Sequence, residues 1–137
     1  MVILLEYEIS TDRARLDVSW VVRALLSTYW ASSRTDETIR RSLEQSLCFG
    51  IFDRASGGQI GFARVITDGA TFGWVCDFFI EPTHRGKGVG KWLMESILAD
   101  GRLKGVTFHL ATKDAHGLYE RYGFVRNETM RKAPSSA

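Results

Sequence analysis

Residues 77–94 read Asp-Phe-Phe-Ile-Glu-Pro-Thr-His-Arg-Gly-Lys-Gly-Val-Gly-Lys-Trp-Leu-Met, and this stretch is the most informative part of the sequence. An apolar strand ends, a basic glycine-rich loop follows, and an amphipathic helix begins. Glycines at alternating positions (Gly86, Gly88, Gly90) let the backbone approach a ligand closely. The free N–H groups and the dipole of the helix's first turn favour an anion at the same place. The stretch therefore predicts a phosphate-binding unit made of a strand, a loop and a helix.

Two common nucleotide-binding patterns do not fit this loop. A Walker loop needs four residues between its glycines and then Lys-Ser or Lys-Thr, whereas three residues separate Gly86 from Gly90 and Trp92 follows Lys91. A dinucleotide fingerprint needs a third glycine and a preceding βαβ unit, which the pattern before this loop does not contain. The prediction is a phosphate site outside the ATPase and dehydrogenase classes. The alternative is a basic turn before a helix, with no ligand.

The segments on either side predict one α+β domain over residues 1–137. Hairpin-turn residues at 56–58 and 68–69 separate three apolar, β-prone runs, as in an antiparallel meander. Helical periodicity stands on both sides of this meander. We expect an α/β/α sandwich around a mixed, mostly antiparallel sheet. The expected strands are Ile3–Ile9, Leu47–Asp53, Gln59–Thr67, Thr71–Ile80, Val106–Ala111 and a last piece from Phe124–Val125; the expected helices are Leu16–Tyr29, a second from N-cap Thr35 to Gln45, a third from Gly88 to Asp100, and Ala115–Tyr122.

Composition excludes several classes of protein. The 137 residues are 45% hydrophobic and carry 18 basic and 16 acidic side chains, so the overall charge gives no reason to expect a nucleic-acid partner. No apolar run approaches the roughly 18 residues of a membrane-spanning helix, and the first ten residues do not resemble a signal peptide. Cys48 and Cys76 lie in apolar stretches without metal-ligand spacing. We expect a metal-free protein of the cytoplasm that binds no membrane.

Two motifs resemble those of the GNAT superfamily of N-acetyltransferases. Arg85-Gly-Lys-Gly-Val-Gly90 matches the pattern Arg/Gln-x-x-Gly-x-Gly/Ala, and Ala115-His-Gly-Leu-Tyr-Glu-Arg-Tyr-Gly-Phe124 is similar to the family's Ala-x-x-x-Tyr-x-x-x-Gly-Phe segment. The motifs stand in the family's order, and the predicted elements follow the family fold over nearly the whole chain. The sequence is thus similar to small bacterial, single-domain members, whose sheet splays into a V-shaped cleft.

The resemblance implies acetyl-coenzyme A as the co-substrate. In the family, loop amides hold the pyrophosphate, the end of the preceding strand pairs with the pantetheine arm, and an amide near Phe78 polarises the thioester carbonyl. Many relatives have an asparagine before the last helix that contacts the coenzyme; in this chain either Thr112 or Asp114 takes its place, or the contact is absent. The implied coenzyme-binding residues are Phe78, Phe79, Ile80, Arg85, Gly86, Lys87, Gly88, Val89, Gly90, Lys91, Thr112 and Tyr119.

The catalytic candidates are Tyr119 and Asp77. The resemblance implies that Tyr119 is the general acid that protonates the leaving thiolate, and the alternative is a packed aromatic side chain. Asp77 lies in an apolar strand and would share a face with Val75 and Phe79 in a regular pleat. Because a buried acid needs a partner, Asp77 is a candidate for base catalysis or substrate binding, or for a structural ion pair. Deprotonation through water, with no dedicated base, is a further alternative.

The acceptor side of the site is expected at the end of the first helix. Tyr29 and Trp30 stand where the family's acceptor groove opens, with Arg34 nearby, although Trp30 could instead only cover the core. The predicted function is direct transfer of acetyl to a small-molecule primary amine in a ternary complex. The alternatives are a protein or peptide acetyltransferase and a coenzyme-binding sensor without turnover. The chain would act as a monomer or a homodimer, and the short C-terminal part would be abbreviated or completed by a neighbouring chain.

Overall fold

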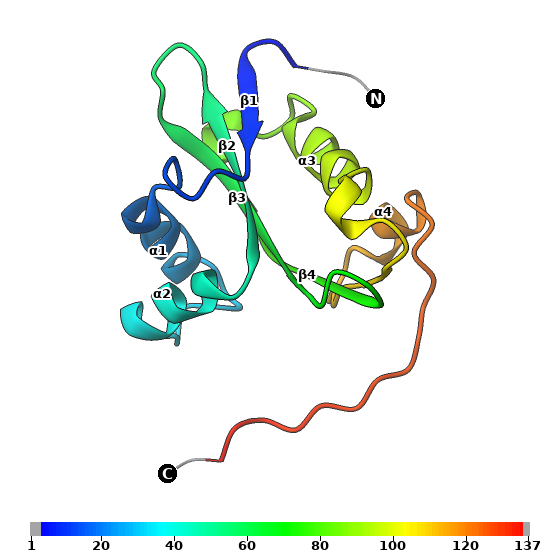
Figure 1. Cartoon of the computed structure of the whole chain (residues 1–137). Helices are drawn as coiled ribbons and strands as arrows, with labels where there is room; N and C mark the ends of the chain where they lie inside the picture. The colour runs from blue at the N-terminus through cyan, green and yellow to red at the C-terminus, as the bar shows by residue number, and fades with distance from the viewer. Residues whose placement is uncertain (1–3, 136–137) are drawn as a thin grey trace.

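A central sheet with helices on both faces forms the body of the protein (Figure 1). The computed structural model describes residues 4–135. Its strands lie in the order β1-β2-β3-β4-β5, with antiparallel neighbours from β1 to β4 and β5 parallel to β4. The strands are β1 (Tyr7–Ser10), β2 (Leu47–Asp53), β3 (Gln59–Thr67), β4 (Phe72–Ile80) and β5 (Thr107–His109); the helices are α1 (Val18–Leu26), α2 (Asp36–Glu44), α3 (Val89–Leu98) and α4 (His116–Glu120), with 3-10 turns η1 (Pro82–His84) and η2 (Gly101–Leu103).

Each face of the sheet buries its own apolar cluster. On one face, α1 and α2 cover Cys48 and Phe62 of the sheet. On the other face, α3 packs Leu93 and Ile97 against the sheet, and the aromatic side chains of α4 and its flanks add to that cluster. A sheet with buried side chains on both faces needs a helical layer on each side, and each helix turns its apolar stripe toward the sheet. The predicted sandwich around a mixed, mostly antiparallel sheet is confirmed.

The last two strands separate after a short paired stretch. Only Phe72–Trp74, the first three of the nine residues of β4, pair with β5. The rest of β4 keeps β3 on one side and has no strand on the other in the part of the chain described. The splayed sheet expected for the family is therefore present, and its open end lies where β4 leads into η1 and α3.

The first two elements are shorter than predicted. Ile3 lies outside the described residues. Strand β1 begins only at Tyr7, because a turn precedes it in which the Tyr7 amide donates a hydrogen bond to the Leu4 carbonyl (3.1 Å). Helix α1 begins after Asp17, whose carboxylate accepts from the Trp20 amide. It ends at Leu26 because the Ser27 hydroxyl donates to a carbonyl of the last turn and competes with the helix ladder. The predicted N-cap of α2 is confirmed, since Thr35 accepts from the Thr38 amide.

The predicted last strand is absent from the sheet. Phe124 packs on the α3 side of the core, but Val125 is 84% exposed, and the chain then runs away from the domain without forming a helix or a strand. Figure 1 shows this extended segment leaving the body of the protein. Two extended residues do not make a strand without a neighbouring strand that accepts their hydrogen bonds, and residues 124–135 have none within the described chain.

Candidate active site

The glycine-rich loop has the backbone conformation that its sequence predicts. Gly86 and Gly88 have φ of +78° and +81°, in the left-handed region that favours glycine. Gly88 caps α3 without a side chain, so no side-chain oxygen competes for the amides of Val89, Gly90 and Lys91 in the first turn. A Cβ added at Gly86 or Gly88 would meet open space. This end of α3 therefore offers free donors and room for a diphosphate, which fits the coenzyme implied by the motif.

Three contacts hold the loop in place. The Arg85 Nε donates to the Ile80 carbonyl at 2.8 Å, and its guanidinium lies 5.5 Å from the centre of the Phe79 ring. At the start of the loop, the Tyr7 hydroxyl and His84 Nδ1 are 2.7 Å apart. Arg85 thus fixes the loop to the end of β4. The contact between β1 and His84 has no signal in the sequence, because it joins residues 77 positions apart.

A β-bulge lies at Asp77. The register between β3 and β4 shifts between Phe62 and Arg64, and Asp77 has φ of +53°, which aspartate tolerates better than most residues. Val75 belongs to the core under α3, while Asp77 faces the connection between α1 and α2. The expectation that Asp77 and Val75 share a face is therefore wrong, because the extra residue of a bulge breaks the alternation of the strand.

Asp77 is 4% exposed, and both of its oxygens are engaged. Oδ1 accepts from Trp30 Nε1 at 3.0 Å; Oδ2 accepts from Arg34 Nη1 at 2.8 Å and from Arg64 Nε at 2.7 Å. Arg64 also donates to the Ser46 hydroxyl at 3.0 Å. Burial alone would raise the pKa of the Asp77 carboxyl, but the hydrogen bonds and charges of the two arginines outweigh it and hold the pKa below its usual value. Two guanidinium groups against one carboxylate leave this cluster with one positive charge in excess.

Tyr119 lies on α4 and packs against the apolar cluster on the α3 side of the sheet. Its ring packs edge-to-face against Phe124, with centroids 6.1 Å apart. Burial raises the pKa of the phenol, and the neighbouring Tyr122 and Tyr29 hydroxyls raise it further. The phenol is therefore protonated at neutral pH, which is the state that a proton donor needs. A cavity of about 720 Å³ adjoins Tyr119, with β5 along one wall.

Tyr29 and Trp30 lie on the connection between α1 and α2, and Tyr29 lies near the segment that precedes α4. Tyr29 is 73% and Trp30 40% exposed, and their rings meet edge-to-face at 5.2 Å. Lys113, between β5 and α4, has its Nζ 6.0 Å from the centre of the Tyr29 ring. The connection between α1 and α2 thus approaches the connection before α4. Next to Lys113, the Thr112 hydroxyl accepts from the Ala115 amide at 3.0 Å and orders the entry into α4.

The structure places the predicted residues in three parts of the domain. The loop and the end of β4 form one part, Asp77 with Trp30 the second, and Tyr119 the third. The ion pair between Arg64 and Asp77 was not predicted from the sequence. A buried aspartate in an apolar strand signals a basic partner, but only the register identifies which arginine lies opposite.

A family model described as an acetyltransferase (GNAT) domain matches residues 44–126. The chain belongs to the GNAT acetyltransferase family. This range contains the loop, the bulge and Tyr119, and so covers both sequence motifs. It ends before most of the extended C-terminal segment.

Individual relatives agree with this family. The chain is 33% identical over 110 residues to an acetyltransferase-named protein of Gibberella zeae, and 40% identical over 97 residues to the chloroplastic serotonin N-acetyltransferase 2 of Oryza sativa. Each alignment covers 67% of this chain; the chain spans 62% and 48% of these curated relatives. A GNAT-family structure from Xanthomonas campestris has a TM-score of 0.87 at 42% identity, covering 93% of this chain and 94% of that one. A structure from Deinococcus radiodurans, described as an acetyltransferase and 21% identical, shares the fold with a TM-score of 0.76, covering 97% of this chain and 92% of that one.

None of the helices within residues 4–135 combines the length and apolar character needed to cross a bilayer. In the same part of the chain, no three His, Cys, Asp or Glu side chains are grouped as metal ligands would be.

Proposed function

We propose that this GNAT protein transfers an acetyl group from acetyl-coenzyme A to the primary amine of a small molecule. The observation that carries the proposal is the uncapped N-terminus of α3, preceded by two glycines at positive φ and placed at the open end of the sheet. Such an end binds phosphate through main-chain amides. Cys48 and Cys76 are free thiols, which suits the reducing cytoplasm.

The proposed coenzyme site follows the chain from β4 into α3. The unpaired edge of β4 offers main-chain groups to the pantetheine amides, in the way that a strand pairs with a neighbour, and the amide near Phe78 would polarise the thioester carbonyl. Loop amides would hold the diphosphate, with charge added by the exposed Lys87 and Lys91. The proposed contacts are Phe78, Phe79, Ile80, Arg85, Gly86, Lys87, Gly88, Val89, Gly90, Lys91, Thr112 and Tyr119.

Tyr119 is proposed as the general acid. In direct transfer, a C–N bond forms at the acetyl carbon, the C–S bond breaks with its electron pair going to sulfur, and the amine loses the proton that the thiolate needs. Burial keeps the Tyr119 phenol protonated, so the side chain can donate that proton. Proton loss from the amine to water, and return of a proton to the phenolate, complete the balance.

The contacts of Asp77 favour a positioning role over base catalysis. A carboxylate with a lowered pKa and three donors on its oxygens is a weak proton acceptor. It holds Trp30 and Arg34, which come from the connection that carries the candidate acceptor residues. We propose that Asp77 orients the acceptor side, and that water removes the amine proton.

The acceptor is proposed to be an amine with an aromatic or apolar body. The exposed rings of Tyr29 and Trp30 suit such a body, and the relative from Oryza sativa is named for an aromatic amine, serotonin. The positive excess of the Asp77 cluster would favour the neutral over the charged amine, because a nearby cation lowers an ammonium pKa. Neutral amine is the form that attacks the thioester.

A panel of amines tests the proposal. Release of coenzyme A would be measured with arylalkylamines, polyamines, amino acids and lysine-containing peptides, and acetyl-coenzyme A binding by calorimetry. Turnover with small amines but not with peptides is expected. Turnover confined to peptides would replace the small-molecule proposal with a protein acetyltransferase. Tight binding without turnover on any amine would support a sensor, and absence of binding would overturn the coenzyme site.

A further inference from the structure

The two arginines bound to Asp77 differ in how many of their donors are used. The Arg64 side chain is 11% exposed and donates both to the Asp77 carboxylate and to the Ser46 hydroxyl. The Arg34 side chain is 29% exposed and makes one hydrogen bond within residues 4–135, from Nη1 to Asp77 Oδ2 at 2.8 Å. Because a guanidinium has five N–H donors, most of those of Arg34 remain available to a ligand.

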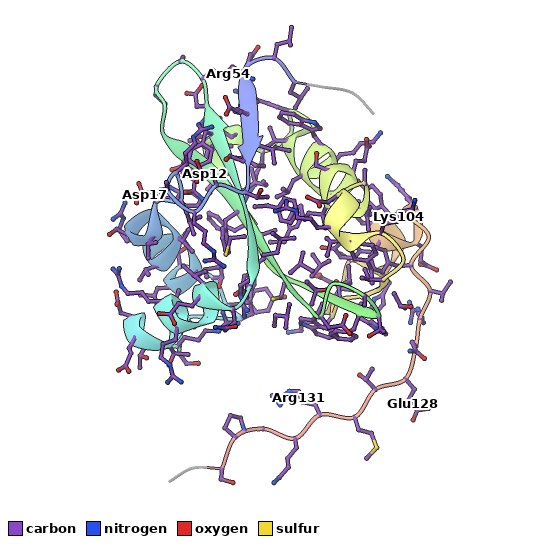
Figure 2. The ribbon with its side chains drawn as sticks, viewed as in Figure 1. Asp12, Asp17, Arg54, Lys104, Glu128 and Arg131 are labelled. Carbon is purple, nitrogen blue, oxygen red and sulfur yellow. The ribbon has the colours of Figure 1, made fainter. Side chains whose placement is uncertain are left out.

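The charge of this cluster is not balanced within the domain. One carboxylate faces two guanidinium groups, and no acidic side chain other than Asp77 pairs with Arg34 within residues 4–135. Asp36, the next acidic residue along the chain, is paired with Arg40 at 2.6 Å. Figure 2 shows side chains filling the layer between α1, α2 and the sheet, where water screens charge less than in bulk solution. A carboxylate on a ligand would balance the excess charge, and its two oxygens match the guanidinium fork.

Arg34 is held beside the place where the acceptor amine is expected to react. Its partner Asp77 directly precedes Phe78, whose amide is proposed to polarise the thioester carbonyl. Trp30 donates to the other oxygen of the same carboxylate, and its exposed ring meets that of Tyr29. One buried carboxylate therefore holds both a cation with unused donors and an aromatic surface next to the proposed thioester site.

We propose that the acceptor carries a carboxylate close to its amine, as an aromatic α-amino acid does, and that Arg34 binds this carboxylate. The proposal rests on the proposed function and narrows its substrate class from amines with an aromatic or apolar body to amino acids. The guanidinium would hold the carboxylate, the rings of Tyr29 and Trp30 would hold the aromatic body, and the amine would be left to attack the thioester. Arg34 is thus a specificity-determining residue, and Asp77 positions it.

Three probes with the same ring system and different charge test this proposal: tryptophan, tryptophan amide and tryptamine. Wild-type enzyme is expected to use tryptophan with the lowest KM. Arg34→Gln is expected to lower kcat/KM for tryptophan about 10- to 100-fold, mainly through KM, because it removes a hydrogen-bonded ion pair, and to change the other two values little. Each substrate is compared with itself, so differences in amine pKa cancel. The amide stands for the N-terminus of a peptide and distinguishes it from a free amino acid.

Arg40→Gln removes an exposed ion pair on α2 and is the matched control, expected to keep all three values. Equal losses on the three probes in Arg34→Gln would assign Arg34 a structural role and overturn the proposal. Wild-type turnover of tryptamine or the amide with no preference for tryptophan would also overturn it, while leaving the transferase function in place.

Calorimetry gives a readout that does not need turnover. N-acetyltryptophan and N-acetyltryptamine would be titrated into the protein with coenzyme A present, and the first should bind more tightly, with that difference lost in Arg34→Gln. If this pattern appears without turnover on any amine, the carboxylate site stands and the proposed transferase function fails. Equal binding of the two products to the wild-type protein would overturn the carboxylate site.

Discussion

The Asp77 carboxylate lies at the centre of a buried network of hydrogen bonds and ion pairs. Asp77→Asn would leave Arg64 buried beside a neutral amide, and removing one partner of a buried ion pair costs about 3–5 kcal/mol. We therefore expect the free energy of unfolding in urea to fall by about that amount. Asp36→Asn removes the exposed pair with Arg40 and should change it by less than about 0.5 kcal/mol. Equal effects of the two variants would contradict the buried network.

The same carboxylate predicts a dependence of stability on pH. Because its pKa is lower in the folded than in the unfolded chain, Asp77 stabilises the protein above the unfolded value of about 3.9. That contribution is lost as pH falls from there through the folded pKa. The difference in unfolding free energy between wild type and Asp77→Asn should be constant near pH 7 and shrink below pH about 4. If the difference in unfolding free energy stays constant below pH about 4, the two arginines do not lower the pKa of Asp77 in the folded protein.

Tyr119 makes a kinetic prediction. Tyr119→Phe keeps the ring and its contact with Phe124 but removes the donor, so turnover should fall about 100-fold or more while the affinity for acetyl-coenzyme A changes little. Tyr122→Phe removes a phenol three residues along the chain, is the matched control and should keep turnover. Coenzyme release and calorimetry measure the two quantities. A Tyr119→Phe enzyme with wild-type turnover would remove Tyr119 from the acid role.

Substitutions at Gly88 and Gly69 distinguish the effect of backbone strain from that of blocking the proposed phosphate site. Gly88→Glu combines a side chain at φ of +81° with negative charge at the phosphate site, so calorimetry should detect no binding of acetyl-coenzyme A. Gly69→Glu carries comparable strain, at φ of +76°, in the hairpin between β3 and β4. It should lower stability similarly while keeping the coenzyme affinity. Loss of binding in both variants would attribute the effect to strain alone.

At the scale of elements, α3 connects the binding loop to the core. Leu93 is fully buried on this helix, and its truncation to alanine should lower the unfolding free energy by about 2–5 kcal/mol, as measured in urea. Leu5→Ala, at an exposed site, should stay within about 0.5 kcal/mol. A small effect of Leu93→Ala would mean that the core closes the space left by the removed side-chain atoms.

The elements that could be predicted from the sequence are those whose structure is set by residues close together in the chain. The meander from Leu47 to Ile80 and the start of α3 follow from strand-forming runs, turn residues and helical periodicity, all of which act within a few positions. The bulge at Asp77 was not predictable, because it depends on arginines that come from two other parts of the chain. The loop of the candidate site was predicted for the same reason as the meander: its glycines and its helix start are adjacent in sequence.

At the scale of the whole molecule, the missing last strand shows the limit of single-chain reasoning. Phe124 and Val125 have the strand-forming character that predicted an extended piece, and the piece is extended. Whether it becomes a strand depends on a neighbouring edge, and local preference cannot specify which edge or which chain supplies it.

The separation of β4 from β5 also has a dynamic consequence. Along the second half of β4, the amides that point away from β3 have no strand beside them among residues 4–135, so in the free protein they should exchange with deuterated water early, without global unfolding. Amides of the same strand that donate to β3 should exchange late. An occupied cleft would slow the first set selectively, and NMR spectra that follow the exchange of individual β4 amides would thereby report binding of the proposed coenzyme.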